Sequence, residues 1–129
     1  MRSRRSWPSP LTWKRVIYLL KHHVRKVELV AARFRGYYTL AGLCGSGLPI
    51  FDVKVNIQAG ARDRVSAFFH EIAHIHLEAS GYSGQGEWVE GVCEECALEF
   101  CGKYPQFAEF LFRKMLQRAE SDMPVCEDW

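Results

Sequence analysis

The residues of this chain best suited to chemistry are two histidines and a glutamate in the pattern His-Glu-x-x-His, at His70, Glu71 and His74. Helical residues four apart lie on one face about one turn apart, so both imidazoles can bind a single Zn²⁺ ion. Glu71 would then stand beside the ion and handle the protons of a water molecule. The pattern therefore predicts a hydrolytic zinc centre, with His70 and His74 as metal ligands and Glu71 as the general base.

The same pattern could also have no catalytic role and consist of two histidines on the helix surface with an ion-pairing glutamate. The neighbouring positions of the helix are apolar, among them Phe69, Ile72 and Ala73. Burying two imidazoles in such surroundings without a metal ion would be costly. We therefore favour the metal site.

A hydrolytic zinc centre needs a third protein ligand, and its candidates are acidic residues of the next expected helix. They are Glu87, Glu90, Glu94, Glu95 and Glu99. If the two helices form an antiparallel hairpin, the histidines lie about 10 Å from the end of the first helix, a depth that corresponds to Glu94. The apolar stripe of the second helix instead points to Glu90. A ligand at the wrong depth cannot reach the ion, so we predict Glu94 and keep Glu90 as the alternative.

The segment 50–101 contains a β-strand, then His-Glu-Ile-Ala-His-Ile-His-Leu from His70, then Glu-Glu-Cys-Ala-Leu-Glu-Phe-Cys from Glu94. In this arrangement it resembles the ImmA/IrrE family of small zinc metallopeptidases, and it is similar in plan to the minimal gluzincins. The resemblance implies a zincin-like fold, a zinc cofactor, a protein or peptide substrate, and Glu94 as the ligand glutamate. It also implies that the strand 52–57 is the edge that pairs with extended substrate.

Three further residues near the motif are candidates for supporting roles. His76 and Tyr82 could donate a hydrogen bond to the oxyanion of the reaction, although His76 is two residues from His74 and should point off the metal face. Packing is therefore the favoured role for His76. Glu78, one turn after His74, could orient a ligand imidazole or lie on the surface.

The elements that must position these residues follow from apolar periodicity and from helix and turn signals. The expected helices cover residues 10–23 (capped by Ser9), 63–80, 87–102 and 105–120, and the expected strands cover 27–34, 37–43 and 50–57. We predict an α+β fold in this order: an N-terminal helix, a small three-stranded, mainly antiparallel sheet, the HExxH helix, the Glu-bearing helix and a C-terminal helix.

The length of 129 residues and the 48% of apolar residues suit one globular domain, which we place at residues 10–120. Residues 1–9 are expected to form a flexible basic arm and residues 121–129 an acidic tail, whose metal-competent groups could occupy the open metal position. The first 35 residues hold ten Lys and Arg and one acidic residue, a net charge of +9. This basic region could engage nucleic acid or an acidic protein, or form a solvated face.

The five cysteines are an odd number, and four of them (Cys44, Cys93, Cys96 and Cys101) fall in or beside expected strands and helices. This pattern does not resemble a disulfide framework, so we expect a cytoplasmic protein. The longest apolar runs are about five residues, far below the roughly 18 needed to span a bilayer, so no membrane association is expected. Cys93, Cys96 and Cys101 are expected to pack in the core rather than form a second metal site.

These features predict a zinc-dependent metallopeptidase that hydrolyses peptide bonds with a metal-activated water and Glu71 as general base. The competing prediction is a non-catalytic, zinc-stabilised regulatory protein that uses its basic N-terminal region to bind an anionic partner.

Overall fold

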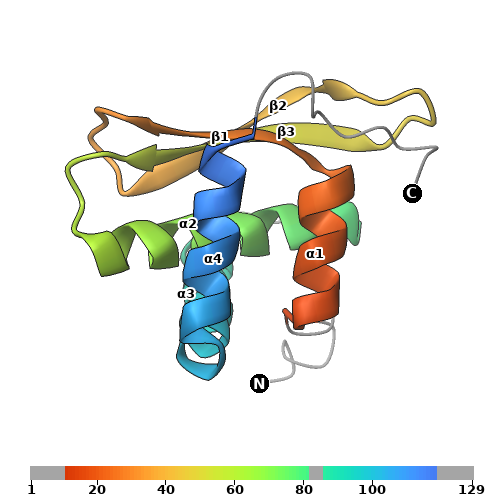
Figure 1. Cartoon of the computed structure of the whole chain (residues 1–129). Helices are drawn as coiled ribbons and strands as arrows, with labels where there is room; N and C mark the ends of the chain where they lie inside the picture. Colours follow the sequence, from red (N-terminus) through yellow and green to blue (C-terminus); the bar gives the residue numbers. More distant parts are fainter. Residues whose placement is uncertain (1–10, 82–85, 119–129) are drawn as a thin grey trace.

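The computed structural model describes residues 11–81 and 86–118. Within these residues the elements are α1 (Trp13–His22), β1 (Val24–Val30), β2 (Gly36–Leu43), β3 (Pro49–Asn56), α2 (Ala61–Ala79), α3 (Glu87–Lys103) and α4 (Pro105–Leu116). Figure 1 shows their arrangement, with a sheet above and the helices below it. The α+β class and the order of helix, sheet and three further helices are confirmed.

The helix ends differ from the expected ones by a few residues, for local reasons. The backbone N–H of Arg15 donates to Oγ1 of Thr12 over 3.1 Å, so Thr12 caps α1. The expected cap at Ser9 lies outside the described residues. α2 begins after Gly60, so Asp63 lies in its first turn instead of capping it. Gly81, with a φ of +93°, follows the last turn of α2 in a conformation that favours glycine.

The sheet has the strand order β1-β3-β2, so the last strand of the three lies in the middle. β2 and β3 are antiparallel, with Tyr38 opposite Val53, whereas β1 and β3 are parallel, with Val27 opposite Val53. The expectation of a mainly antiparallel sheet is therefore wrong for the β1–β3 pair. Each of the two connections reverses the chain, so β1 and β3 run in the same direction once they are neighbours. Period-two alternation reports which face of a strand is buried, not which strand lies beside it.

The central place of β3 also changes which strand could bind an extended peptide. Both edges of β3 are hydrogen-bonded to neighbouring strands over most of its length. The expectation that residues 52–57 form a substrate-binding edge is therefore wrong. Among the described residues, the outer edges of the sheet belong to β1 and β2.

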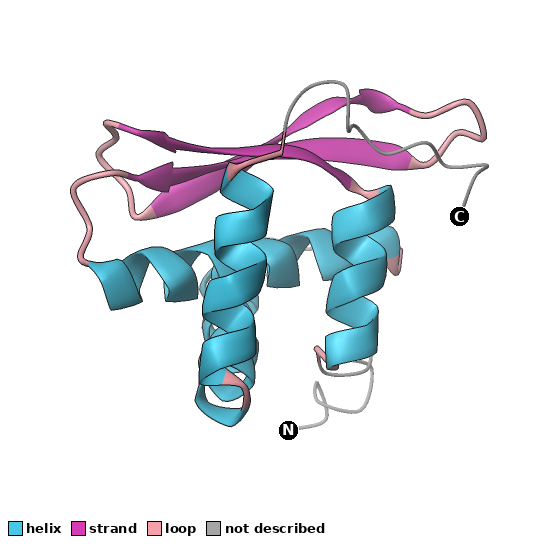
Figure 2. Cartoon of the chain, viewed as in Figure 1, coloured by secondary structure: helices cyan, strands magenta, loops and turns pink. Residues whose placement is uncertain are grey.

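All the helices of the described part of the chain pack on one face of the sheet, as Figure 2 shows. From β3, Phe51, Val53 and Val55 point into this layer and are buried. The core continues below α2, where the ring of Phe69 lies 4.9 Å from that of Phe100 of α3, measured between centroids. The apolar character of α2 on nearly all sides follows from its position between the sheet and the other helices.

The opposite face of the sheet carries charged pairs. Arg25 of β1 forms an ion pair with Asp52 of β3, with Nη2 and Oδ2 2.5 Å apart. Nζ of Lys54 lies 2.5 Å from Oε1 of Glu28 on the same two strands. Arg25, one of the basic residues of the first 35, is thus paired within the fold. None of the described helices is long and apolar enough to cross a membrane.

Candidate metal centre

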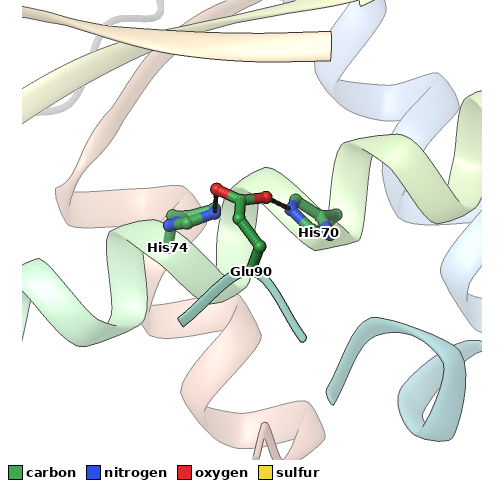
Figure 3. Close-up of side chains that lie close together, drawn as sticks. All are labelled: His70, His74 and Glu90. Carbon is green, nitrogen blue, oxygen red and sulfur yellow. Dashed lines mark hydrogen bonds and ion pairs between the residues drawn. The ribbon is translucent and has the colours of Figure 1, made fainter. Parts of the chain in front are cut away.

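Three side chains from two helices converge on one point, as Figure 3 shows. His70 and His74 project from α2, and Glu90 comes from the first turn of α3. The Glu90 carboxylate lies 2.8 Å from Nε2 of His70 through Oε1 and 3.0 Å from Nε2 of His74 through Oε2. One ligand atom from each of the three residues lies within 4.8 Å of the other two. The three residues could therefore hold a metal ion.

The donor set of this group fits zinc. Two imidazole nitrogens and one carboxylate oxygen form the ligand set of many hydrolytic zinc sites. In a tetrahedral site with bonds of about 2.0–2.1 Å, ligand atoms lie roughly 3.3 Å apart. The two nitrogen–oxygen contacts of 2.8 and 3.0 Å are slightly shorter than this, and one ligand atom from each residue lies within 4.8 Å of the other two. Both histidines present Nε2, which leaves their Nδ1 atoms for other hydrogen bonds.

Glu94, the favoured third ligand of the sequence analysis, lies on the other side of the His70 ring. Its Oε1 is 2.8 Å from Nδ1 of His70. The structure thus brings Glu90, the alternative, to the position expected for Glu94. The hairpin estimate of depth assumed that the two helices run side by side, but Figure 1 shows α3 leading away from α2. The first turn of α3 therefore reaches the histidines, as the apolar stripe around Glu90 had indicated.

Glu94 is itself held in place by Arg35, which precedes β2. Nη1 of Arg35 lies 3.3 and 3.4 Å from the two oxygens of Glu94, and Nη2 donates to Oγ of Ser66 over 2.9 Å. A carboxylate fixed beside Nδ1 favours the tautomer in which Nδ1 of His70 donates to it, so that Nε2 is available to a metal ion. The sequence offered no signal for Arg35, because only the tertiary fold brings it to α3.

Glu71 is buried beneath the beginning of β2. A Cβ atom built on Gly36 would lie 3.7 Å from Cγ of Glu71, so the strand passes close above this side chain. Burial raises the pKa of the Glu71 carboxyl to about 7, the positive charge of Arg35 acting weakly in the opposite direction. A carboxyl with such a pKa can take up and release a proton near neutral pH.

Glu71 and the three converging residues line one open cleft of about 790 Å³. Its walls come from the residues around the start of β2, from α2 and from the start of α3. The lining residues are Phe34, Arg35, Gly36, Tyr37, Tyr38, Ala67, His70, Glu71, His74, Leu77, Glu78, Gly86, Val89 and Glu90. The cleft is large enough for several residues of a peptide and opens to solvent at the converging side chains.

Tyr38 of β2 is a site residue that the sequence analysis missed. Its ring stacks on His74 with 5.5 Å between centroids, and its hydroxyl donates to Oε2 of Glu78 over 2.7 Å. Glu78 lines the cleft and is held by this hydroxyl. The sequence places Tyr38 in an expected strand, but it could not show that this strand lies over α2.

The structure describes one of the other two supporting candidates, His76. His76 is buried, does not line the cleft, and accepts a hydrogen bond at Nδ1 from Nε of Arg15 over 3.0 Å. This contact with α1 agrees with the packing role favoured for His76. Tyr82 lies outside the described residues, as do the basic arm 1–9 and the acidic tail 121–129.

The cysteines of α3 belong to the core. Cys93 is fully buried, Cys96 and Cys101 pack against the core cluster, and none of the three is in a disulfide. Burial raises the pKa of the Cys101 thiol to about 11, so it is protonated at neutral pH. Cys44, which follows β2, is disulfide-bonded. A disulfide is more typical of oxidising compartments, so the cysteines lend no support to the expected cytoplasmic location.

Comparisons with family models, with curated proteins and with solved structures gave no significant match. The similarity to the ImmA/IrrE metallopeptidases therefore stays a prediction from a few residues.

Proposed function

We propose that this protein is a zinc-dependent metallopeptidase. The observation that carries the proposal is the convergence of Nε2 of His70 and Nε2 of His74 on the carboxylate of Glu90, in the wall of a cleft that also contains the buried Glu71. A donor set that fits a metal ion, a buried carboxyl and an open cleft thus occur together, and hydrolysis needs such a combination.

His70, His74 and Glu90 would hold the ion, which would supply a Lewis acid that activates water and polarises an amide carbonyl. Glu71 accepts the proton of the attacking water and returns it to the leaving amine. Glu94 keeps the ring of His70 in the orientation that binding requires.

The substrate would lie along β2. An outer strand with unpaired backbone groups can pair with an extended peptide, and proteins usually protect such edges with charged residues or proline. β1 carries Arg25, Lys26 and Glu28, whereas β2 has neither a charged residue nor a proline. β2 also borders the cleft through Gly36, Tyr37 and Tyr38. An extended peptide on this edge would run past the converging side chains.

The competing prediction, a non-catalytic protein that binds an anionic partner, gains no comparable observation. Among the described basic residues of the first 35, Arg25 pairs with Asp52, Lys26 with Glu28, and Arg35 with Glu94. These positive charges are used within the fold.

Metal analysis and a protease assay with matched variants test the proposal. Purified protein is stripped of metal, loaded with zinc and assayed on unfolded, fluorescently labelled protein. We expect one zinc ion per chain, no bound zinc in His70→Ala, and full zinc content in Glu71→Gln with hydrolysis at least about 100-fold slower. Glu99→Gln removes an exposed carboxylate of α3 and serves as the control with wild-type behaviour.

Two results would contradict the proposal in different ways. Equal zinc content in the wild type and His70→Ala would exclude the metal site. Stoichiometric zinc binding without hydrolysis in the wild type would support the non-catalytic alternative.

A further inference from the structure

Glu78 is an exposed carboxylate of the cleft that the proposed chemistry does not use. It follows His74 by four residues on α2 and lines the cleft. Its Oε2 accepts a hydrogen bond of 2.7 Å from the hydroxyl of Tyr38, which is a neutral donor. Glu78 is therefore held in position without being neutralised.

The other charges of the cleft have partners. Arg35 pairs with Glu94, and Glu90 contacts both histidines at the proposed metal site. Glu71, the remaining carboxyl of the cleft, is buried and is the proposed base. Among the described cleft residues, Glu78 is thus the exposed carboxylate that has no ion pair. A partly exposed carboxylate in such a position attracts a cationic group and discriminates against an anionic one.

The relation of β2 to α2 sets the side of the scissile bond on which this cation would lie. Gly36 lies over Ala67 and Glu71, and Tyr38 stacks on His74 and bonds to Glu78. β2 and α2 thus proceed in the same direction along the cleft. We take the peptide to pair antiparallel to β2, because this pairing is slightly more stable per residue than the parallel one. Such a peptide passes Tyr38 before it reaches Gly36. The residues before its scissile bond therefore lie near Glu78.

Resting on the proposed peptidase function, we propose that Glu78 selects substrates with a cationic group on the amino-terminal side of the scissile bond. Four helical residues correspond to about 6 Å along the axis of α2. An extended peptide advances about 3.3 Å per residue, so Glu78 lies about two residues from the position of His74. The cation belongs to one of the three residues before the bond. Tyr38 acts as a positioning residue, because it holds Glu78 toward the cleft.

Two sources can supply this cation, a Lys or Arg side chain and the free α-amino group of a short peptide. Both present an ammonium or guanidinium group to the carboxylate. Peptides with an acetylated N-terminus can supply the cation only from a Lys or Arg side chain. Peptides with a free N-terminus but without Lys and Arg can supply it only from the α-amino group.

Cleavage-site profiling tests the proposal. Zinc-loaded wild type, Glu78→Gln and Glu78→Lys are incubated with a synthetic library of acetylated peptides with randomised sequence, and the cleaved bonds are identified by mass spectrometry. We expect Lys and Arg at the three positions before the bond to be enriched about threefold to fivefold in the wild type, as for a partly exposed ion pair. The enrichment should vanish in Glu78→Gln and turn into a preference for Asp and Glu in Glu78→Lys.

Two further variants separate specificity from general damage. Tyr38→Phe keeps the ring on His74 but removes the hydrogen bond to Glu78, and it should lower the enrichment without lowering zinc content. Glu99→Gln should leave the profile unchanged. A wild-type profile with the basic residue after the bond would overturn the proposal. A profile without any basic preference would also overturn it if peptides without Lys and Arg are cleaved equally well with a free and with an acetylated N-terminus.

A binding measurement keeps this proposal distinct from the peptidase function itself. Zinc-loaded Glu71→Gln is titrated with fluorescent acetylated peptides that differ only in Arg or Gln at the three positions. Tighter binding of the Arg peptides, lost in the double variant with Glu78→Gln, supports the role of Glu78 even if the wild type cleaves nothing. The Gln peptides are also titrated with a free N-terminus. Equal binding of the Arg and Gln peptides, together with equal binding of the free and acetylated Gln peptides, refutes the role of Glu78, whatever the result of the hydrolysis assay.

Discussion

Oε1 of Glu94 lies 2.8 Å from Nδ1 of His70, on the opposite side of the ring from Nε2, which Glu90 contacts. One histidine ring thus lies between two glutamates of the same helix, one turn apart. The two carboxylates have different roles in this arrangement. Glu90 shares a point with both histidines, and Glu94 fixes the orientation of one of them.

Removing these two carboxylates separately should therefore weaken metal binding to different extents. Glu94→Ala is expected to lower zinc affinity by about 10-fold to 100-fold, as for the loss of a carboxylate that orients a ligand histidine. Glu90→Ala removes a ligand and should lower the affinity further. Competition with a chromogenic chelator measures both. The assignment fails if Glu94→Ala binds zinc more weakly than Glu90→Ala does.

Substituting Gly36 should disturb the cleft through the backbone. A Cβ atom at this position would lie 2.9 Å from the carbonyl oxygen of Lys54 on β3, so β2 would have to move. Gly36→Ala is expected to cost about 1–3 kcal/mol of unfolding free energy, as for overpacking, and to slow hydrolysis by shifting the strand above Glu71.

Gly91 provides the matched control for this substitution. It lies within α3, and a Cβ atom there would meet nothing within 4 Å. Gly91→Ala should stabilise the protein by about 0.5–1 kcal/mol, because alanine is the better helix former. Urea denaturation of both variants measures whether each substitution raises or lowers the free energy of unfolding. A stabilising effect of Gly36→Ala would contradict the close approach of this position to the carbonyl oxygen of Lys54.

Burial of His23 should make stability depend on pH. Its Nδ1–H donates to the carbonyl of Pro49 over 2.8 Å. Burial lowers the pKa of the ring; the hydrogen bond to Pro49 acts against this shift, and the charge of Arg15 adds to it. The unfolded chain therefore binds a proton more readily than the folded one. Stability from this group is present above the unfolded pKa of about 6.5 and is lost as pH falls from there through the lower folded pKa.

His23→Asn tests this dependence, because its amide can still donate to Pro49 but does not titrate. Between pH 7 and pH 5, the wild type should lose stability more steeply than His23→Asn, by at most about 1.4 kcal/mol per pH unit. The slopes come from urea denaturation of the metal-free proteins at a series of pH values. Parallel curves for the two proteins would exclude the role assigned to His23.

The packing of α3 on α2 should support the site as well as the fold. Phe100 is 1% exposed and its ring packs on Phe69. Phe100→Ala is expected to cost about 3–5 kcal/mol of unfolding free energy. It should also weaken zinc binding, because Glu90 depends on the same helix contact. Phe110→Ala on α4, where the side chain is 54% exposed, is the control and should be nearly neutral. Unchanged stability in Phe100→Ala would refute this assignment.

Local patterns in the sequence were enough to predict the helices, the strands and the two histidines of α2. Apolar periodicity and cap signals act over a few residues, so they identified every element of the described chain, with ends that differ by a few residues. The spacing of His70 and His74 is likewise a property of a single helix. These predictions needed no knowledge of how one element packs on another.

Relations between elements were decided only by the tertiary structure. The choice of Glu90 over Glu94, the place of β3 between its neighbours, and the arrival of Arg35 and Tyr38 at the cleft all depend on packing of distant segments. Periodicity defines the buried face of a helix or strand, but the partner of that face and the angle of approach follow from how the whole core is filled. The sequence thus determined the chemistry-bearing residues of α2, and the packing of α3 and β2 against α2 decided what those residues meet.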